Sequence, residues 1–488
     1  MVRITQAVFY FSQIVFLGLS IIDGVHKRTL YSKTNMFIKS RYCIFMKGRQ
    51  MMDMYEKLKN KLENKDFAIC ILGIGRVGLP LALSFAEKNI LVYGVDKNSD
   101  LLSKLRKRIM PFIEEGAQAL LDKSLETGKL VPTEDIGLAV KKSDVIIVTV
   151  GTPLDIGLRP DYDQLKKSLE ELVKSLEPGK LIILRSTVSA GNTEKIVIPY
   201  IKEKTGLEAG VDFWIAACPE RIVEGRAIEE IKTLPELIGG YCPRSTTLAS
   251  TVLSILGPDK KMIKMDPTSA ELAKLFTNVF RYVTFALSNE YALLAENYGR
   301  SAHEIIRALN DDYPRGGVPL PGPAGGPCLF KDGYYLVHDL AFPDFVLMAW
   351  RLNEAIPAHV VNRIKKGLHE QGKQLRDEKV AVLGLAYKAD IDDSRYSPSK
   401  RLVELLLNEG AKVSVNDPYF DTEPLDKALL NAGVVVLATP HSAYKELNPK
   451  HISELVSPTC FIFDCWNFLD KKSFSEAKLP ILVFGEGP

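Results

Sequence analysis

The chain has 488 residues, 46% hydrophobic and 25% charged, and its formal net charge is +3. This balance is typical of a globular protein with two or three domains, and the small net charge argues against nucleic acid as a partner. The seven cysteines are an odd number without a CxxC pair, which argues against a disulfide framework. We therefore expect a reducing, cytoplasmic setting and no metal site.

The beginning of the chain contains an apolar segment. Residues 7–22 are mostly apolar, and a run of sixteen residues is short for a membrane span and nearer to the core of a signal peptide. A secretory signal, a membrane anchor and an extension ahead of the true start remain open. We favour an extension over residues 1–65, without membrane attachment, because several methionines precede the first domain: Met46, Met51, Met52 and Met54.

Short apolar runs that alternate with helical stretches follow residue 66. Continuous apolar runs are typical of strands in a parallel sheet that is covered on both faces. They occur at residues 67–72, 90–95, 145–150 and 181–184 and, in a second series, at 380–383, 412–415, 434–437 and 460–463. We therefore predict an α/β fold with two doubly wound Rossmann-like domains.

A long central helix is predicted between the two series of strands. Residues 268–271 (TSAE) have the form of a capping box after Pro267, and Gly299 marks the end of the helical pattern. A helix of this length joins domains or packs against a partner subunit, with a plain core helix as the alternative. The loop at 314–327 is rich in proline and glycine, but it ends beside a cysteine, a lysine and an aspartate, which a linker does not need.

A glycine motif follows the first strand and opens the next helix at residues 73–78 (GIGRVG). Its first glycine permits a tight turn, the second lets the backbone approach a pyrophosphate, and the third lets helix and strand pack closely. Asp96 ends the second strand, where a carboxylate binds a ribose hydroxyl and repels a 2′-phosphate, although Lys97 beside it weakens this preference for NAD over NADP. The residues expected to hold NAD are Gly73, Gly75, Arg76, Val77, Gly78 and Asp96.

Three segments place functional residues four positions apart. The pairs are Glu220 and Glu224, Lys274 and Asn278, and Cys328 and Asp332. On a helical turn both members of such a pair project to one face. Each pair has an ordinary alternative, which is an exposed helix face for the first two and coincidence in a loop for the third. Beside a dinucleotide motif, however, they form a set suited to covalent oxidation.

The chemistry explains this set. Oxidation of an alcohol to an acid takes two hydride transfers and one hydrolysis, and the aldehyde has to be held in between. The Cys328 thiolate can form a thiohemiacetal and then a thioester. Lys274 and Asn278 can stabilise the oxyanions, Asp332 can act as base, and a glutamate can orient the hydrolytic water. Two glycines before the cysteine would let the backbone approach the substrate: Gly325 and Gly326.

Seven segments in this order resemble the UDP-glucose/GDP-mannose dehydrogenase family: residues 73–78, 150–153 (VGTP), 185–188 (RSTV), 218–225 (CPERIVEG), 273–278 (AKLFTN), 325–332 (GGPCLFKD) and 384–388 (GLAYK). The resemblance spans residues 66–480. It implies a cofactor domain for NAD at 66–262, a central helical region for dimerisation and the catalytic cysteine at 263–372, and a nucleotide-sugar (UDP)-binding domain at 373–488. It also implies a homodimer or a higher homo-oligomer.

The resemblance implies roles at matching positions. Cys328 corresponds to the nucleophile, Lys274 and Asn278 to the oxyanion-stabilising pair, and Asp332 to the base. Glu220 is implied to assist thioester hydrolysis. The remaining implied roles are water positioning by Thr187, cofactor contacts by Thr152, Lys331 and Arg395, and substrate contacts by Arg221, Glu224, Arg315 and Lys388, with Arg315 reaching the neighbouring subunit.

The substrate expectation rests on two segments, residues 218–221 (CPER) and 313–315 (YPR). They are more similar to the family branch that acts on UDP-N-acetylhexosamines, above all UDP-N-acetyl-D-mannosamine, than to the NPEF form of UDP-glucose enzymes. Arg221 can bind an acetamido carbonyl. The alternatives are UDP-N-acetylglucosamine, UDP-glucose and, last, GDP-mannose. Other classes are a non-catalytic nucleotide-sugar sensor, a membrane-anchored scaffold and a simple two-electron alcohol dehydrogenase.

Overall fold

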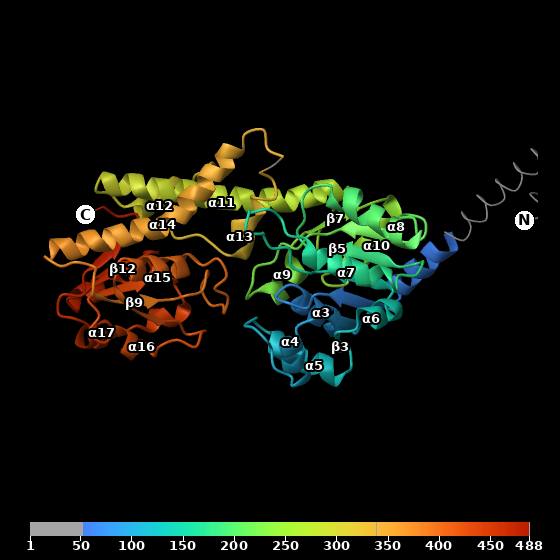
Figure 1. The fold of residues 1–488 in the computed structure, drawn as a ribbon, viewed down its shortest axis with the longest axis horizontal. Coiled ribbons are helices and arrows are strands. Elements are labelled where there is room, and N and C mark those ends of the chain that lie inside the picture. Colours follow the sequence, from blue (N-terminus) through green and yellow to red (C-terminus); the bar gives the residue numbers. More distant parts are fainter. Residues whose placement is uncertain (1–51, 338, 488) are drawn as a thin grey trace, which may run out of the picture. The chain divides into compact units, whose positions relative to one another are not determined.

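The computed structural model describes residues 52–337 and 339–487 (Figure 1). The predicted apolar segment at 7–22 lies outside these residues. None of the helices in the described ranges is long and apolar enough to cross a membrane.

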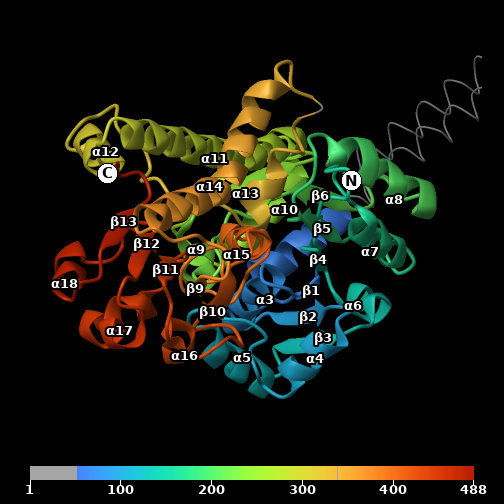
Figure 2. The same cartoon turned by 60° about the vertical axis from the view of Figure 1, so that its left-hand side comes forward.

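The larger sheet has eight strands in the order β3-β2-β1-β4-β5-β6-β7-β8. The first five of these labels can be followed as neighbouring strands in Figure 2. The pairing is parallel except between β6 and β7, so the last two strands run opposite to the rest. The strands are β1 (Ala68–Leu72), β2 (Leu91–Val95), β3 (Leu130–Thr133), β4 (Val145–Val148), β5 (Leu181–Leu184), β6 (Trp214–Ala217), β7 (Glu236–Gly240) and β8 (Met262–Met265).

The helices of this sheet alternate with its strands. The strands β1, β4, β5 and β6 are buried throughout, as continuous apolar runs predict. The helices are α3 (Gly78–Glu87), α4 (Ser99–Arg106), α5 (Ala117–Glu126), α6 (Ile136–Lys142), α7 (Asp163–Val173), α8 (Ile198–Thr205), α9 (Ala227–Thr233) and α10 (Pro243–Ser254), with a π-helical turn η2 (Thr193–Val197) before α8.

The smaller sheet is parallel throughout, with the order β10-β9-β11-β12-β13. Its strands are β9 (Lys379–Leu383), β10 (Lys412–Asn416), β11 (Val434–Leu437), β12 (Phe461–Asp464) and β13 (Ile481–Val483). Its helices are α15 (Pro398–Asn408), α16 (Leu425–Leu429), α17 (Pro449–Leu455) and α18 (Lys471–Glu476), with a 3₁₀ turn η3 (Ser442–Glu446). The prediction of two doubly wound sheets is confirmed.

Four helices lie between the two sheets in the sequence: α11 (Pro267–Asn297), α12 (Ala302–Asn310), α13 (Pro327–Asp332) and α14 (Pro343–Glu370). The helix α11 has 31 residues, which confirms the predicted long helix. The predicted capping box is wrong. Asp266 caps the helix by accepting a hydrogen bond from the Ser269 N–H, while the Thr268 hydroxyl bonds Glu194 and Glu271 accepts from the Gly191 N–H. An aspartate one residue ahead of Pro267 offers its oxygen to the first turn directly.

The two ends of the helix α11 belong to different hydrophobic cores. Near its start, Ala270 packs with Ala217 and Leu237 of the larger sheet. Near its end, Ala292 and Ala295 belong to the cluster on one face of the smaller sheet. Its second half packs against α14, which crosses it in Figure 1. Side chains near the start of α11 therefore lie in fixed positions relative to the strand ends of the larger sheet.

Candidate active site

Two short helical pairs form the centre of the site. Cys328 and Asp332 lie on the single helix α13, and Lys274 and Asn278 lie on α11, so both pairs share a helical turn as predicted. The Asn278 side-chain amide donates a hydrogen bond of 2.6 Å to Asp332 Oδ2. Asp332, Lys274 and Asn278 are buried, whereas Cys328 is exposed. The thiol is thus the part of this group that an incoming molecule can reach.

Lys331 neutralises the buried Asp332. Its Nζ lies 3.2 Å from Asp332 Oδ1 and 3.4 Å from the hydroxyl of Thr152, and it sits 4.6 Å from the centre of the Tyr335 ring. Burial lowers the pKa of Lys331, but Asp332, Tyr335 and Cys328 together outweigh burial and raise it. A lysine that stays charged keeps an anionic Asp332 compensated inside the protein.

The charges around Cys328 act in opposite directions on its thiol. The protein wall behind the side chain reduces hydration and raises the pKa of the thiol, although the outer side of Cys328 stays open to solvent. Lys274 lowers the pKa, Asp332 raises it, and Lys331 lowers it again. Since the thiolate is the nucleophilic form, the two lysines favour the reactive state of Cys328.

Trp350 of α14 holds the helix α13 in place. Its indole N–H donates a hydrogen bond of 2.6 Å to the Phe330 carbonyl, and its ring packs edge-on against Tyr282 at 4.4 Å between ring centres. A Cβ added to Gly333 would lie 2.3 Å from the Trp350 ring, so the two surfaces are in close contact. Trp350 was not predicted as a site residue, because a tryptophan in a helical pattern is typical of a hydrophobic core.

Glu220 is anchored by a buried ion cluster. Arg185 Nε donates to Glu220 Oε2 at 3.0 Å, a second nitrogen of Arg185 also contacts that oxygen, and its guanidinium contacts Glu236 at 3.2 Å. Glu236 in turn lies 2.8 Å from Lys260 Nζ. Loss of hydration raises the pKa of Glu220, but Arg185, with the Arg221 N–H and Lys260, outweighs it and holds the pKa below its usual range. Glu220 is therefore kept as a carboxylate.

Arg185 was missed as a functional residue, although it begins the RSTV segment and directly follows the buried strand β5. A cation placed at the end of a buried strand was the available signal. Glu220 and Glu224 do not share a helical turn, because residues 218–226 have no helical structure, so their spacing does not place them on one helix face. Backbone N–H groups of this loop bind the Glu220 carboxylate instead, from Arg221 at 2.8 Å and Ile222 at 3.2 Å.

A pocket lies beside the start of α11. The Thr152 hydroxyl donates to the Thr187 carbonyl at 2.7 Å and thereby ties the VGTP turn to the RSTV segment. The pocket lining includes Lys274, one of the two predicted oxyanion-stabilising residues, and Thr187, the predicted water-positioning residue. Its lining consists of Leu184, Ser186, Thr187, Val188, Thr193, Ala217, Pro219, Glu271 and Lys274.

Glu224 lies in a second group of charges, together with Asp393, Arg76 and Arg395. Arg395 Nη2 is 3.3 Å and Arg76 Nη1 is 3.9 Å from the Glu224 carboxylate, and the Lys388 Nζ donates to the Glu224 carbonyl at 2.8 Å. Loss of hydration and the Asp393 carboxylate raise the pKa of Glu224 to about 7, against the opposing effect of the two arginines. The predicted residues Glu224, Arg395 and Lys388 are thus brought together.

The glycine motif fits a dinucleotide. Gly73 has a φ of +92°, and a Cβ on Gly78 would lie 2.0 Å from the Gly73 carbonyl oxygen, so both positions require glycine. A Cβ on Gly75 would meet nothing within 4 Å, which leaves open space beside the backbone for a pyrophosphate. Val77 immediately precedes α3, and Asp96 follows β2 and accepts from the Asn98 N–H at 2.9 Å. The motif has the strand, turn and helix that phosphate binding needs.

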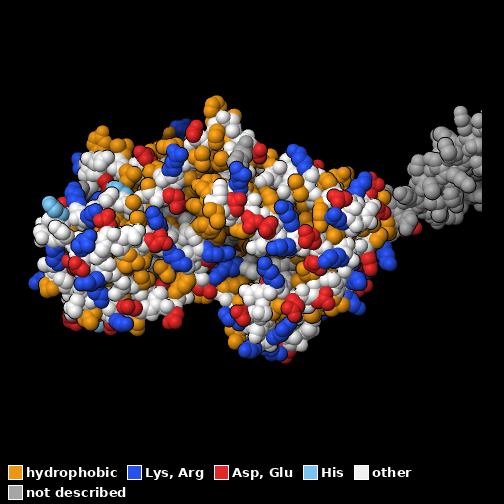
Figure 3. Space-filling model, in the orientation of Figure 1, with side chains coloured by type: hydrophobic (Ala, Val, Ile, Leu, Met, Phe, Trp, Pro, Cys, Tyr) orange, Lys and Arg blue, Asp and Glu red, His pale blue; other side chains and the backbone are white. Residues whose placement is uncertain are grey.

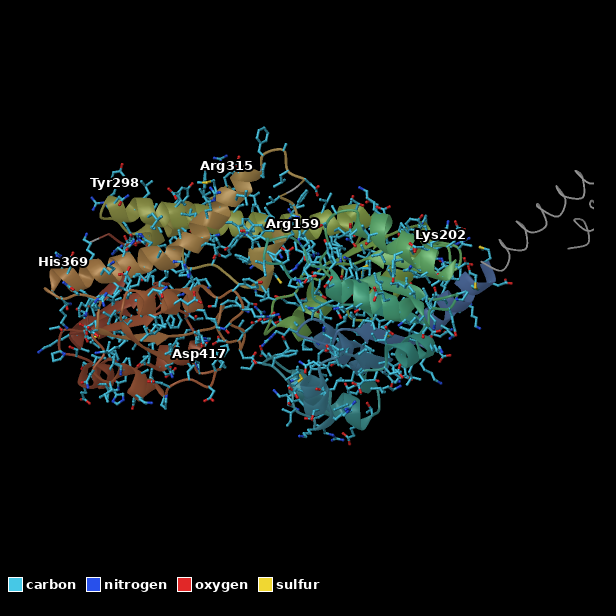
Figure 4. All side chains as sticks on the ribbon, viewed as in Figure 1. Arg159, Lys202, Tyr298, Arg315, His369 and Asp417 are labelled. Carbon is cyan, nitrogen blue, oxygen red and sulfur yellow. The ribbon has the colours of Figure 1, made fainter. Side chains whose placement is uncertain are left out.

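Four predicted substrate contacts have protein neighbours of their own. The Arg221 guanidinium donates to the Pro235 carbonyl, outside the group around Cys328. Arg315, labelled in Figure 4, stacks on Tyr313 and is exposed in the segment between α12 and α13. A Cβ on Gly325 would lie 2.5 Å from Pro398, and one on Gly326 would lie 2.5 Å from the Tyr387 ring, so close packing with the chain itself already demands both glycines.

Three family models match the chain. They are described as the NAD binding domain, the central domain and the UDP binding domain of the UDP-glucose/GDP-mannose dehydrogenase family, and they match residues 67–256, 268–355 and 381–471. The matched ranges contain both helical pairs, the glycine motif and the loop that carries Lys388 and Arg395.

Curated relatives and solved structures match over most of the chain. A UDP-N-acetyl-D-mannosamine dehydrogenase of Pyrococcus horikoshii is 35% identical over 391 residues, which are 79% of this chain and 92% of the relative. A UDP-N-acetyl-D-glucosamine 6-dehydrogenase of Pseudomonas aeruginosa is 29% identical over 426 residues, 83% of this chain and 98% of the relative. The solved structure of the UDP-D-ManNAc dehydrogenase from Pyrococcus horikoshii matches with a TM-score of 0.81 and 33% identity, over 86% of this chain and 99% of that one.

Proposed function

Because the chain belongs to the UDP-glucose/GDP-mannose dehydrogenase family and binds NAD through its first domain, we propose that it oxidises the C6 hydroxyl of a UDP-N-acetylhexosamine to a carboxylate. UDP-N-acetyl-D-mannosamine is the proposed substrate, in agreement with the CPER segment and with the relative that is 35% identical. UDP-N-acetylglucosamine and UDP-glucose are the alternatives, and the first of them is favoured by the relative that is 29% identical.

The observation that carries this proposal is the environment of Cys328. Its thiol is exposed, lies one helical turn from the buried Asp332, and is influenced electrostatically by Lys274 and Lys331. A simple two-electron alcohol dehydrogenase has no use for such a thiol. A non-catalytic sensor does not need a buried Asp332 held by Asn278 at 2.6 Å.

The residues divide the reaction between them. NAD accepts the hydrides when it is bound. Asp332, held by Asn278, takes the proton of the C6 hydroxyl. The Cys328 thiolate adds to the resulting aldehyde and keeps it in the site, and oxidation of this adduct leaves a thioester on Sγ. Lys274 and the Asn278 amide stabilise the negative oxygen of the tetrahedral states.

Hydrolysis of the thioester completes the proposed reaction. Glu220 is held ionised by Arg185 and can accept a hydrogen bond from the attacking water. Thr187 lines the same pocket as Lys274 and can position that water. The balance is one alcohol, one water and two NAD⁺ converted to one carboxylate, two NADH and three protons.

A panel of UDP-sugars with NAD, followed by NADH absorbance, tests the proposal. We expect turnover of UDP-N-acetyl-D-mannosamine with two NADH per substrate. One NADH per substrate would contradict acid formation, and turnover of UDP-glucose alone would contradict the N-acetylhexosamine assignment. Cys328→Ser should lose net oxidation to the acid, whereas the control Cys242→Ser, a partly exposed cysteine at the start of α10, should keep it.

We also propose that a second copy of the chain covers an apolar stripe on α11. Its six exposed residues recur every three, four or seven positions and so share one helix face: Phe276, Phe280, Leu287, Tyr291, Leu294 and Tyr298. Figure 4 labels Tyr298 at the end of this helix. Further exposed apolar residues, Phe342, Phe345 and Met348, stand at the upper end of α14, where Figure 3 shows hydrophobic side chains. Apolar surface of this extent on a protein marks an interaction site.

Light scattering after size exclusion tests this dimer. We expect the mass of two copies or more for the wild type and of one copy for Phe280→Glu, because the charge is placed in the stripe. The control Leu138→Glu changes an exposed apolar residue of α6, which packs against α7 and the larger sheet, and should leave the mass unchanged. A single-copy wild type, or a Phe280→Glu variant with unchanged mass, would contradict the proposed interface.

Residue roles and location complete the proposal. The domain division at residues 66–262, 263–372 and 373–488 and the substrate contacts by Arg221, Arg315 and Lys388 remain proposals. The described cysteines are free thiols, which supports a reducing compartment. These are Cys70, Cys218, Cys242, Cys328, Cys460 and Cys465. We propose the cytoplasm as that compartment.

A further inference from the structure

Arg76 of the glycine motif contacts the loop that follows β9 of the smaller sheet. Its Nη1 lies 2.8 Å from Asp392 Oδ1, its Nη2 donates to the Asp392 carbonyl at 2.9 Å, and its Nε lies 3.7 Å from Asp393 Oδ2. The guanidinium also lies 5.1 Å from the centre of the Phe112 ring. The side chain is therefore engaged by the protein, in an arrangement that a lysine cannot reproduce.

The same loop has further attachments to the larger-sheet region. The Ile113 N–H donates to Asp392 Oδ1 at 3.2 Å, so this one oxygen accepts from two separate segments. Lys388, four residues before Asp392, donates to the Glu224 carbonyl at 2.8 Å. Both Arg76 and Asp392 have 21% of their side chains exposed, and partly buried charged hydrogen bonds of this kind are stronger than exposed ones.

Arg76 and Asp392 each lie beside one of the two expected ligand-binding sites. Arg76 stands between Gly75 and Val77, in the turn where the backbone approaches the pyrophosphate. Asp392 stands in the loop after the carboxyl end of β9, and ligands of open α/β sheets bind outside the carboxyl ends of the strands. The contact between Arg76 and Asp392 thus joins the turn expected to bind the dinucleotide to the loop expected to lie beside the nucleotide of the UDP-sugar.

We propose that Arg76 is a positioning residue that couples the binding of the dinucleotide to the binding of the UDP moiety through Asp392. This inference rests on the proposed function, which supplies the two ligands. A ligand that orders either segment also orders the other through the contact, so the second ligand binds to a site that is already arranged. Linkage requires the effect to be reciprocal, with each ligand strengthening the other by the same factor.

Fluorescence titration of the protein with NADH, with and without saturating UDP, measures this coupling. We expect UDP to tighten NADH binding in the wild type by about tenfold, within the usual range of coupling between sites. Asp392→Asn should reduce the factor to about two or less and keep the affinity for NADH alone within about twofold. The matched control is Glu404→Gln, which removes an exposed ion pair with Arg401 on α15 and should keep the full factor.

Arg76→Met provides the second variant, and the double variant closes a thermodynamic cycle. We expect the double variant to lose no more coupling than either single variant, because both changes break one contact. An unchanged factor in Asp392→Asn, an equal loss of NADH binding with and without UDP, or a wild-type factor of one would each overturn the inference. A wild type that does not bind UDP at all would instead refute the proposed function. Circular dichroism confirms that each variant is folded.

Discussion

Glu224 makes the stability of the protein depend on pH in a way that a single substitution removes. Its pKa is about 7 in the folded protein, above the ordinary value of 4.5. As the pH rises from 4.5 to 7, the unfolded chain releases this proton while the native protein keeps it, so the native state loses stability over that window and the loss is complete above it. Glu224→Gln has no proton to lose, so its advantage over the wild type grows with pH.

The size of the effect follows from the pKa values. The gap between 7 and 4.5 is about 2.5, and at about 1.4 kcal/mol per pKa step it corresponds to about 3 kcal/mol at pH 8.5 and about 1.4 kcal/mol at pH 5.5. The Glu224 side chain is largely buried, with only 16% of it exposed, so loss of hydration can cause a pKa shift of this size. The free energy of unfolding of Glu224→Gln minus that of the wild type should therefore increase by about 2 kcal/mol between the two pH values.

Urea denaturation at pH 5.5 and 8.5, followed by circular dichroism and by tryptophan fluorescence, measures this difference. The control is Glu229→Gln, because Glu229 is exposed and pairs only with Arg226 in its own helical turn, and such pairs contribute little. A difference for Glu224→Gln that stays constant with pH, or that decreases as the pH rises, would refute the reasoning.

Two further substitutions test the packing around α13. Gly326 and Gly317 have φ values of +99° and +98°, but only at Gly326 would a Cβ strike another residue, Tyr387, at 2.5 Å. Gly326→Ala should therefore lower the free energy of unfolding by about 2 kcal/mol more than Gly317→Ala in the same denaturation assay, and equal effects would contradict the clash. Trp350→Phe leaves the Phe330 carbonyl without its donor, which costs about 1–3 kcal/mol. We expect its kcat to fall while NADH affinity in a fluorescence titration stays unchanged, and weaker NADH binding would contradict a role limited to α13.

The sequence was most informative where one local pattern decides the structure. The buried strands β1 and β4 appear as unbroken apolar runs because both faces of a parallel sheet are covered. Helical spacing picked out the pair Cys328 and Asp332 and the pair on α11, the family resemblance supported them, and the structure places each pair on one turn. These features depend on neighbours within a few residues, so they are legible in a single sequence.

Features that depend on partners far apart in the sequence could not be predicted from the sequence. The position of Arg185 after a buried strand is a local signal, but its partners Glu220 and Glu236 lie 35 and 51 residues away and are seen only in the folded interior. The capping box failed for the same reason, since Glu271 is recruited by the distant Gly191 N–H, 80 residues away, and not by the helix start. Arg76 was predicted as a cofactor contact, and its guanidinium was found on Asp392, 316 residues away.

The membership of α11 in two cores also bears on how the protein unfolds. Ala270 is packed among residues of the larger sheet, and Ala292 and Ala295 are packed against the smaller one. Melting of either core removes the surface that stabilises one end of this helix, and helices in water depend on such packing for their stability. The cores of the larger and the smaller sheet should therefore unfold cooperatively, so differential scanning calorimetry should show one transition for both. A fragment that ends within α11 would lose Lys274 and Asn278, the proposed oxyanion-stabilising pair, as ordered groups, even if they remained in its sequence.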